Sequence, residues 1–186
     1  MTEGNKMKVL GFAGSLRKGS FNKMLLKAAQ ESAPSDMELE IFDLEGIPPF
    51  NQDFERDPHP KVKEFKAKIK AADGLLIVTP EYNYSIPGVL KNAIDAASRP
   101  YGTSPFEEKP VAIMGTSIGM LGSARAQYHL RQSMVFLNAY PMNRPEIMVP
   151  FAETKFSPDG RLTDETTREK VKEFMVELVK WIRKFK

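Results

Sequence analysis

Gly14-Ser15-Leu16-Arg17-Lys18-Gly19-Ser20-Phe21-Asn22 joins an apolar run to a segment with helical periodicity. The apolar run, residues 9–13, predicts a buried strand that spans residues 8–13. Apolar side chains then recur at helical spacing, at Phe21, Met24, Leu25, Ala28 and Ala29. A helix N-terminus after a strand and a short loop is a ready anion site, because its first N–H groups lack partners and its dipole end is positive. The loop carries glycines, hydroxyls and cations but no carboxylate, which favours phosphate binding.

An ordinary strand-to-helix turn is the alternative interpretation of the same residues. In such a turn Ser20 caps the helix N-terminus, and Arg17 and Lys18 extend into solvent. Residues 14–22 leave both interpretations open, so other segments of the chain must discriminate between them.

Strands and helices alternate along the rest of the chain. Apolar patterns predict further strands at residues 37–42, 74–79, 111–114 and 147–149. Helical spacing recurs in the segments 62–72, 90–97, 126–137 and 171–185. The 37–42 segment alternates apolar and acidic residues, which is typical of a half-exposed strand at a sheet edge. Five strands that alternate with helices imply parallel crossovers, so we expect a three-layer α/β domain with a five-stranded parallel sheet and helices on both faces.

A long loop is predicted at residues 45–60, which contain Pro48, Pro49, Pro58 and Pro60. Prolines lack a backbone donor and interrupt regular structure. Long loops in compact domains are usually functional or mobile.

Three loops follow strands at the carboxyl edge of the predicted sheet, where such folds bind their ligands. The first is the loop described above. The second, residues 80–85, offers Tyr82 and Tyr84 to cover a flat heterocycle, unless both rings are half-buried packing residues. The third, residues 115–123, is rich in glycine, which lets backbone approach a ligand closely; a flexible connection is the alternative. Their convergence favours a ligand that bears a phosphate.

Composition bounds the chemistry that the chain can perform. A length of 186 residues predicts one domain, residues 1–186. The net charge of +3 is mild and the charges are mixed, so we expect no nucleic-acid partner. There is no cysteine, which excludes disulfides, thiolate nucleophiles and iron–sulfur clusters. Any redox chemistry must therefore be carried by an organic cofactor.

The first six residues are polar, and no apolar run approaches membrane-spanning length. We therefore expect no membrane insertion and a cytoplasmic location.

Several kinds of site compete for the three loops. Ser117 lies in a pattern typical of a nucleophile elbow, but a serine hydrolase needs a later acid and histidine, and His129 follows too closely. A dinucleotide site with Asp43 on the ribose needs G-x-G-x-x-G, which the first loop lacks. His59 and His129 are too few for a metal site, and the acidic cluster of a receiver domain is absent. A mononucleotide with one phosphate and a flat ring, flavin mononucleotide (FMN), meets none of these objections.

At this point the sequence resembles the NAD(P)H-dependent FMN reductases with a flavodoxin-like fold, especially the chromate and quinone reductase branch. The resemblance rests on residues 14–22, 80–95 and 124–132, which occur in the right order. It implies a parallel sheet of strand order 2-1-3-4-5. It also implies one departure, because Ala96 stands where that branch commonly carries tryptophan.

The resemblance assigns roles to residues of all three loops. The first would hold the FMN phosphate and the other two would border the ring, mostly through backbone atoms. The implied cofactor-binding residues are Ser15, Leu16, Arg17, Ser20, Asn22, Pro80, Glu81, Tyr82, Asn83, Tyr84, Ser117 and Gly119. No catalytic side chain is implied, because the flavin carries the chemistry.

The implied function is an oxidoreductase that uses NADPH or NADH and passes hydride through FMN to quinones, chromate, azo compounds or free flavin. The alternative is a non-enzymatic flavodoxin-like module that binds a nucleotide or carries electrons. The resemblance also implies a homodimer or homotetramer, with polar contacts between subunits from Tyr84, Arg99, Tyr128 and Glu146.

Overall fold

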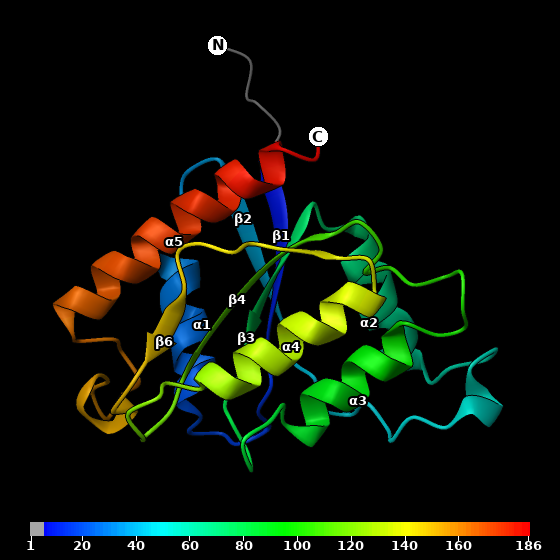
Figure 1. Cartoon of the computed structure of the whole chain (residues 1–186), viewed down its shortest axis with the longest axis horizontal. Helices are drawn as coiled ribbons and strands as arrows, with labels where there is room; N and C mark the ends of the chain where they lie inside the picture. Colours follow the sequence, from blue (N-terminus) through cyan, green and yellow to red (C-terminus); the bar gives the residue numbers. More distant parts are fainter. Residues whose placement is uncertain (1–5) are drawn as a thin grey trace.

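The computed structural model describes residues 6–186; residues 1–5, most of the polar N-terminal segment, lie outside the described residues. A sheet of parallel strands forms the middle of three layers, with helices on both faces (Figure 1). The strands are β1 (Met7–Ala13), β2 (Met37–Phe42), β3 (Gly74–Val78), β4 (Pro110–Thr116), β5 (Tyr140–Pro141) and β6 (Ile147–Val149). The helices are α1 (Phe21–Glu31), α2 (Pro60–Ala71), α3 (Gly88–Ala97), α4 (Ala124–Phe136) and α5 (Glu165–Arg183), with short 3-10 turns η1 (Gln52–Phe54) and η2 (Ala152–Thr154).

The order of the strands is β2-β1-β3-β4, with β5 and β6 both beside β4. This is the doubly wound order 2-1-3-4-5 of the flavodoxin-like fold, and the predicted fold class is confirmed. In β3 and β4 every residue is buried, as expected for parallel strands covered on both faces. In β2 buried and exposed residues are mixed, which confirms that it forms the edge.

Each face of the sheet has its own apolar core, because successive side chains of a strand point to opposite faces. Leu76 and Val78 of β3 join the core under α1 and α5, whereas Leu75 and Ile77 join the core under α2, α3 and α4. Figure 1 shows α1 beside α5 and α3 beside α4. In the second core the Phe65 ring lies edge-on to the ring of Phe12, with 5.1 Å between their centres.

The fifth strand differs from its prediction, because it is split in two. Tyr140 and Pro141 pair with the start of β4, and β6 pairs with its end. The sequence predicted only residues 147–149, since Pro141 and Pro145 interrupt the apolar pattern between the two halves.

The carboxyl ends of β1, β3 and β4 lie at one edge of the sheet, as the parallel registers require. We call the segments that follow them loop 1 (residues 14–20), loop 2 (residues 79–87) and loop 3 (residues 117–123). Over residues 6–186 no helix is both long and apolar enough to cross a membrane.

Candidate functional site

Loop 1 presents backbone donors at the N-terminus of α1. Ser20 is the N-cap, and its buried Oγ accepts a hydrogen bond from the Lys23 N–H at 3.4 Å. The N–H groups of Phe21 and Asn22, the first two helical residues, have no hydrogen-bond partner within residues 6–186. The capping role of Ser20 is thus observed, and it leaves free the donors that a phosphate needs.

The charged residues of loop 1 lie beside these donors. Leu16, Arg17 and Lys18 are exposed, and the first turn of α1 holds no acidic residue. The guanidinium carbon of Arg17 lies 5.4 Å from the centre of the Phe21 ring, at the start of the helix. A bound dianion would therefore meet positive charge from both the helix and the arginine.

Asn22 has a use that the sequence did not predict. Its buried side chain donates to the carbonyl of Thr116 and accepts from the Thr116 N–H, both at 3.0 Å. The side-chain amide is committed to the end of β4, so only its backbone N–H is available to a phosphate.

Loop 2 contains a tight hairpin with an unusual backbone. Tyr82 and Ser85 exchange two hydrogen bonds of 3.1 and 3.0 Å, and Asn83 and Tyr84 between them have φ values of +49° and +66°. Positive φ at both central residues is the geometry of a type I′ turn, and it is uncommon for tyrosine. The rings of Tyr82 and Tyr84 are 51% and 67% exposed, so neither is part of the core.

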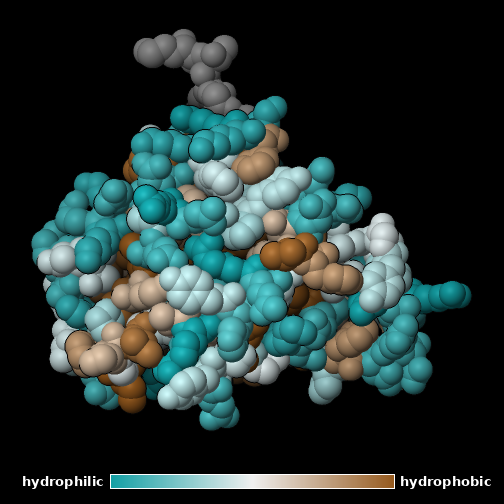
Figure 2. Space-filling model, viewed as in Figure 1, coloured by the Kyte–Doolittle hydropathy of each residue, from teal (hydrophilic) through white to brown (hydrophobic). Residues whose placement is uncertain are grey.

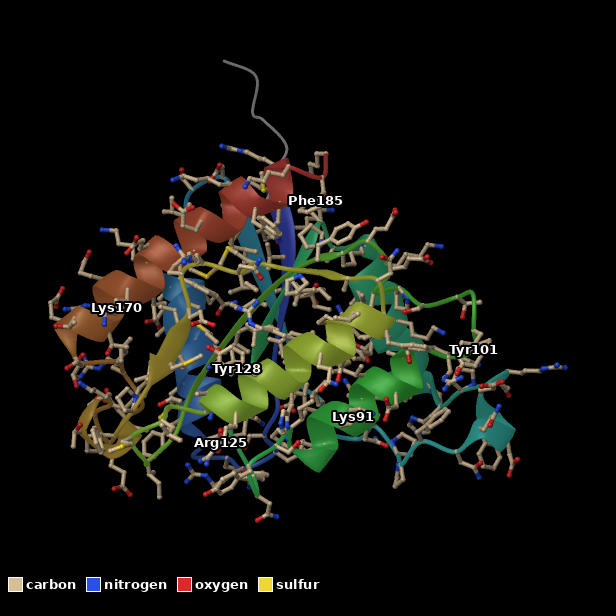
Figure 3. All side chains as sticks on the ribbon, viewed as in Figure 1. Lys91, Tyr101, Arg125, Tyr128, Lys170 and Phe185 are labelled. Carbon is tan, nitrogen blue, oxygen red and sulfur yellow. The ribbon has the colours of Figure 1, made fainter. Side chains whose placement is uncertain are left out.

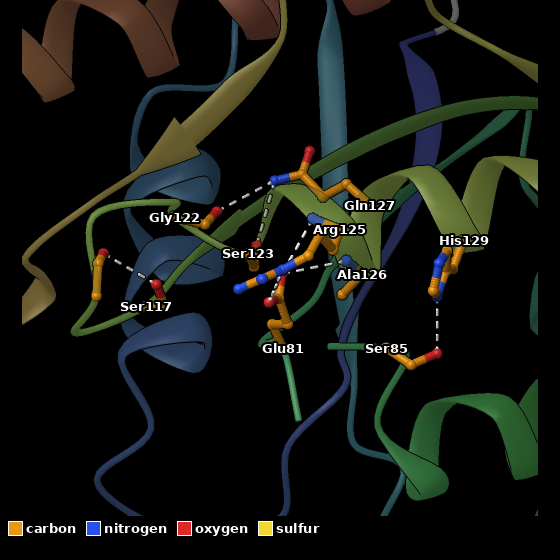
Figure 4. A network of polar contacts seen from close by, with 10 residues as sticks. Glu81, Ser85, Ser117, Gly122, Ser123, Arg125, Ala126, Gln127 and His129 are labelled. Carbon is orange, nitrogen blue, oxygen red and sulfur yellow. Dashed lines mark hydrogen bonds and ion pairs between the residues drawn. The ribbon is translucent and has the colours of Figure 1, made fainter. Parts of the chain in front are cut away.

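An ion pair fixes loop 2 to the start of α4. The Nε of Arg125 donates to Glu81 Oε1 at 2.6 Å, and Glu81 Oε2 accepts from the N–H groups of Arg125 and Ala126 at 3.0 and 3.3 Å. Figure 4 shows this carboxylate against the first turn of α4. The guanidinium carbon of Arg125 also lies 3.4 Å from the centre of the Tyr84 ring. Burial lowers the pKa of Arg125, but the hydrogen bonds and charges of Glu81 and Tyr84 together outweigh this, so the pKa is raised.

The role of the Glu81 side chain was missed by the sequence, which assigned mainly backbone contacts to this loop. One indication was available, because α4 begins with no acidic residue in its first turn and lacks a side-chain cap of its own. A carboxylate from elsewhere in the chain can therefore bind its N–H groups.

Two glycines leave no room for a side chain: Gly115, the next-to-last residue of β4, and Gly122 in loop 3. A Cβ on Gly115 would lie 2.1 Å from Ser123 Oγ, and one on Gly122 would lie 2.6 Å from the carbonyl carbon of Met148. Ser117 donates to the Gly119 carbonyl at 3.1 Å, and its own carbonyl accepts from the Ala152 N–H at 3.0 Å. The loop is therefore bonded in place, in contrast to the flexible connection considered as the alternative.

Together the three loops fit a mononucleotide. Loop 1 supplies free N–H groups and positive charge for one phosphate. Loop 2 supplies two accessible aromatic rings. At Gly119 an added Cβ would be 3.9 Å from the nearest atom, Ser117 Oγ, so the backbone there is open to a ligand.

The competing kinds of site find no support in the geometry. His129 Nδ1 lies 2.9 Å from the Oγ of Ser85, and Ser117 bonds to Gly119 instead of to a histidine (Figure 4). The Asp43 carboxylate, considered for a ribose, binds the Lys23 ammonium at 2.8 Å. Burial raises the pKa of Asp43, but the bonds from Lys23 and the Glu45 N–H, together with the charges of Lys23 and Lys61, lower it more. In the described part of the chain, no three His, Asp or Glu side chains are placed to hold a metal ion.

Exposed apolar side chains on loop 1, on loop 3 and just after β6 were also missed. They are Leu16, Ile118, Met120, Leu121 and Phe151. The Phe151 N–H donates to the Gly119 carbonyl at 3.4 Å, so the residue lies against loop 3. A loop sequence alone does not reveal which of its apolar residues stay exposed.

Comparison with known proteins agrees with this geometry. The family model for NADPH-dependent FMN reductase matches residues 7–154. The NAD(P)H-dependent FMN reductase of Pseudomonas aeruginosa is 49% identical over 181 residues, 97% of each chain. The 2-hydroxy-1,4-benzoquinone reductase of a Burkholderia species is 45% identical over 177 residues, 95% of this chain and 97% of that protein.

A solved structure is similar over nearly the whole chain. It is the flavoenzyme FerB of Paracoccus denitrificans, an NAD(P)H:(acceptor) oxidoreductase, with a TM-score of 0.89 and 37% identity over 96% of this chain and 98% of that one. The resemblance seen in the sequence motifs is therefore confirmed, and the chain belongs to the NADPH-dependent FMN reductase family.

Proposed function

We propose that the protein is an FMN-dependent oxidoreductase that transfers reducing equivalents from NADPH or NADH to quinones. The observation that carries this proposal is the convergence of loops 1, 2 and 3 at one edge of the sheet, with N–H groups for a phosphate at the start of α1, directly after loop 1, that are unpaired within residues 6–186. The names of the relatives support it, since they include an FMN reductase and a benzoquinone reductase.

The residues that would hold FMN fall into two groups. At the phosphate they are Ser15, Leu16, Arg17, Ser20 and Asn22, the last through its backbone. At the ring they are Pro80, Glu81, Tyr82, Asn83, Tyr84, Ser117 and Gly119. Bound FMN would supply the hydride chemistry. The protein would hold the ring with an open face and orient it through loops that are fixed before binding.

The exposed apolar residues of loops 1 and 3 favour an apolar acceptor. Ile118 and Met120 project from loop 3, close to the backbone that we assign to the ring. Apolar surface of this kind gains free energy when it covers an apolar molecule such as a quinone ring. Reduction of chromate, azo compounds or free flavin remains a prediction from the resemblance.

We also propose that the protein forms a homodimer through the C-terminal end of α4. Val135, Phe136 and Tyr101 are 79%, 73% and 67% exposed, and Figure 2 shows apolar side chains gathered at this end of α4. The Tyr101 and Phe136 rings lie edge to face with centres 6.3 Å apart. Exposed apolar clusters on one face are typical of interfaces. A homotetramer, the cytoplasmic location and one domain over residues 1–186 remain predictions.

Steady-state turnover tests the proposed activity against the non-enzymatic alternative. The FMN-loaded protein is mixed with NADPH or NADH and with benzoquinone, chromate or no acceptor. We expect oxidation of the nicotinamide to be fastest with benzoquinone. A protein that binds FMN but consumes no nicotinamide with any acceptor would instead be a nucleotide-binding or electron-carrier module.

A further inference from the structure

A pocket lies apart from the three loops, between the segment that follows β2 and the helices α2 and α3. Its volume is about 500 Å³, within the range of small-molecule sites. The lining residues are Pro48, Pro49, Phe50, Asn51, Phe54, Glu55, Asp57, Pro58, His59, Val62 and Ala96. None of them belongs to loop 1, loop 2 or loop 3.

The walls of this pocket are fixed in the absence of a ligand. The side chain of Asn92 on α3 accepts from the Phe50 N–H at 2.7 Å and donates to the Pro48 carbonyl at 2.9 Å. The prolines of the segment restrict its backbone further. Ala96 lines the pocket from α3 with a single methyl group, which leaves the volume open.

The polar groups of the pocket disfavour an anion. Its lining contains two carboxylates and no lysine or arginine. The nearby N-terminus of α2 offers no free donor in its first turn: Pro60 has none, the Lys61 N–H is bonded to His59 Nδ1, and those of Val62 and Lys63 are bonded to the His59 carbonyl. An acidic ligand would therefore meet repulsion without compensation.

Glu55 gives the pocket its charge preference. The Asp57 carboxylate is paired with the Lys63 ammonium at 2.6 Å. Glu55, by contrast, lines the pocket and has no ion pair within residues 6–186. A carboxylate without an ion pair in a lining that holds no lysine or arginine attracts a cation, so a ligand that brings a charged donor is favoured.

We infer that this pocket binds a planar aromatic molecule that carries a protonated amine. Phe50, Phe54 and Val62 would cover its ring, and Glu55 would accept the hydrogen bond from its ammonium group. The His59 Nδ1 accepts from Lys61, so in the neutral ring Nε2 carries the proton and adds a donor for a hydroxyl or carbonyl on the ring. The inference does not depend on the proposed function, because it uses none of the flavin-site residues.

Calorimetric titration of the FMN-loaded protein tests the inference with three probes that share one ring. Tryptamine is cationic, indole is neutral and indole-3-acetate is anionic. We expect affinity to decrease in that order. Equal binding of indole-3-acetate and tryptamine would overturn the charge assignment, and no binding of tryptamine would overturn the site.

Three variants locate the binding. Glu55→Gln keeps the shape of the side chain. It should weaken tryptamine binding about tenfold and have little effect on indole binding. Ala96→Trp should fill the pocket and abolish binding of both. Phe54→Ala is the alternative if Ala96→Trp does not fold. It removes an exposed residue of the pocket wall, so we expect it to weaken binding of both probes without unfolding the protein. Arg56→Ala is the matched control, an exposed neighbour that does not line the pocket.

One further outcome would contradict the inference. If Ala96→Trp changes the molar mass in solution and wild type binds no probe, the pocket holds a segment of a second copy of the chain. Light scattering on the same samples measures this.

Discussion

The side chain of Asn22 and the backbone of Thr116 exchange two hydrogen bonds of 3.0 Å each, although they are 94 positions apart in the sequence. Asn22 lies in the first turn of α1, directly after loop 1, and Thr116 is the last residue of β4, directly before loop 3. This pair therefore fixes the proposed phosphate loop relative to a proposed ring loop. Loop 2 is joined to α4 in a comparable way by Glu81 and Arg125, so all three loops are positioned before a ligand binds.

Replacement of Asn22 tests the role of these two hydrogen bonds. Asn22→Ala should lower the free energy of unfolding by about 1–3 kcal/mol, because two buried backbone groups of Thr116 lose their partners. It should also weaken FMN binding, since loops 1 and 3 would no longer be held in fixed positions relative to each other. Urea unfolding of the FMN-free protein measures the first effect and fluorescence titration the second. Lys27→Ala, on the exposed side of α1, is the control. An unchanged free energy of unfolding would show that the two hydrogen bonds between Asn22 and Thr116 do not contribute to stability.

Arg17 tests the phosphate assignment. Arg17→Ala should weaken FMN binding by about tenfold, which corresponds to the loss of one charge-assisted hydrogen bond. Riboflavin has no phosphate, so its affinity should not change. The comparison of the two flavins separates loss of phosphate binding from damage to the ring site. Lys18→Ala, the exposed neighbour, should have a smaller effect. An equal loss of affinity for FMN and riboflavin would indicate that Arg17 contacts the ring instead of the phosphate.

Asp164 is expected to make stability depend on pH. Hydrogen bonds from Lys155 and Thr167 hold the pKa of this N-cap carboxyl at about 2, below its usual 3.8. A lowered pKa stabilises the folded state above pH 3.8, and this stabilisation is lost as the pH falls toward about 2. Wild type should therefore be more stable than Asp164→Asn at neutral pH, and the difference should shrink across that interval. Urea unfolding at several pH values checks this, and a difference independent of pH would contradict it.

The end of α4 carries the proposed dimer interface. Phe136→Glu places a charge within the apolar cluster and should reduce the molar mass from that of a dimer to that of a monomer. Lys170→Glu is the control, because Lys170 is exposed on α5, on the opposite side of the molecule from Tyr101 (Figure 3). Size-exclusion chromatography with light scattering measures both. A wild-type monomer, or a Phe136→Glu dimer, would place the interface elsewhere or remove it.

Local patterns were sufficient to predict the sheet and the three loops. The buried strands β3 and β4 are continuous apolar runs, and loop 1 lies between such a run and a clear helical periodicity. What the sequence did not reveal depends on contacts between distant residues. Glu81 meets Arg125 across 44 positions, and Asn22 meets Thr116 across 94. Which residues form such pairs is decided by the packing of whole elements, and neither pattern nor composition records it.

The split of the fifth strand was missed for a different reason. Tyr140–Pro141 is only two residues long, and a proline in a strand argues against strand assignment. Its pairing with Pro110 and Val111 is imposed by the edge of β4. The twelve predicted cofactor-binding residues remain predictions, although the structure brings the loops that carry them to one edge of the sheet.

Flavin binding and reduction, followed by absorbance without oxygen, tests the central claim most directly. The flavin-free protein is titrated with FMN, then with NADPH or NADH, and then with benzoquinone. We predict that FMN binds in equimolar amount, that its visible absorbance bleaches with the nicotinamide, and that benzoquinone restores it. A protein that binds no FMN, or whose bound FMN is not reduced by either nicotinamide, would contradict the account.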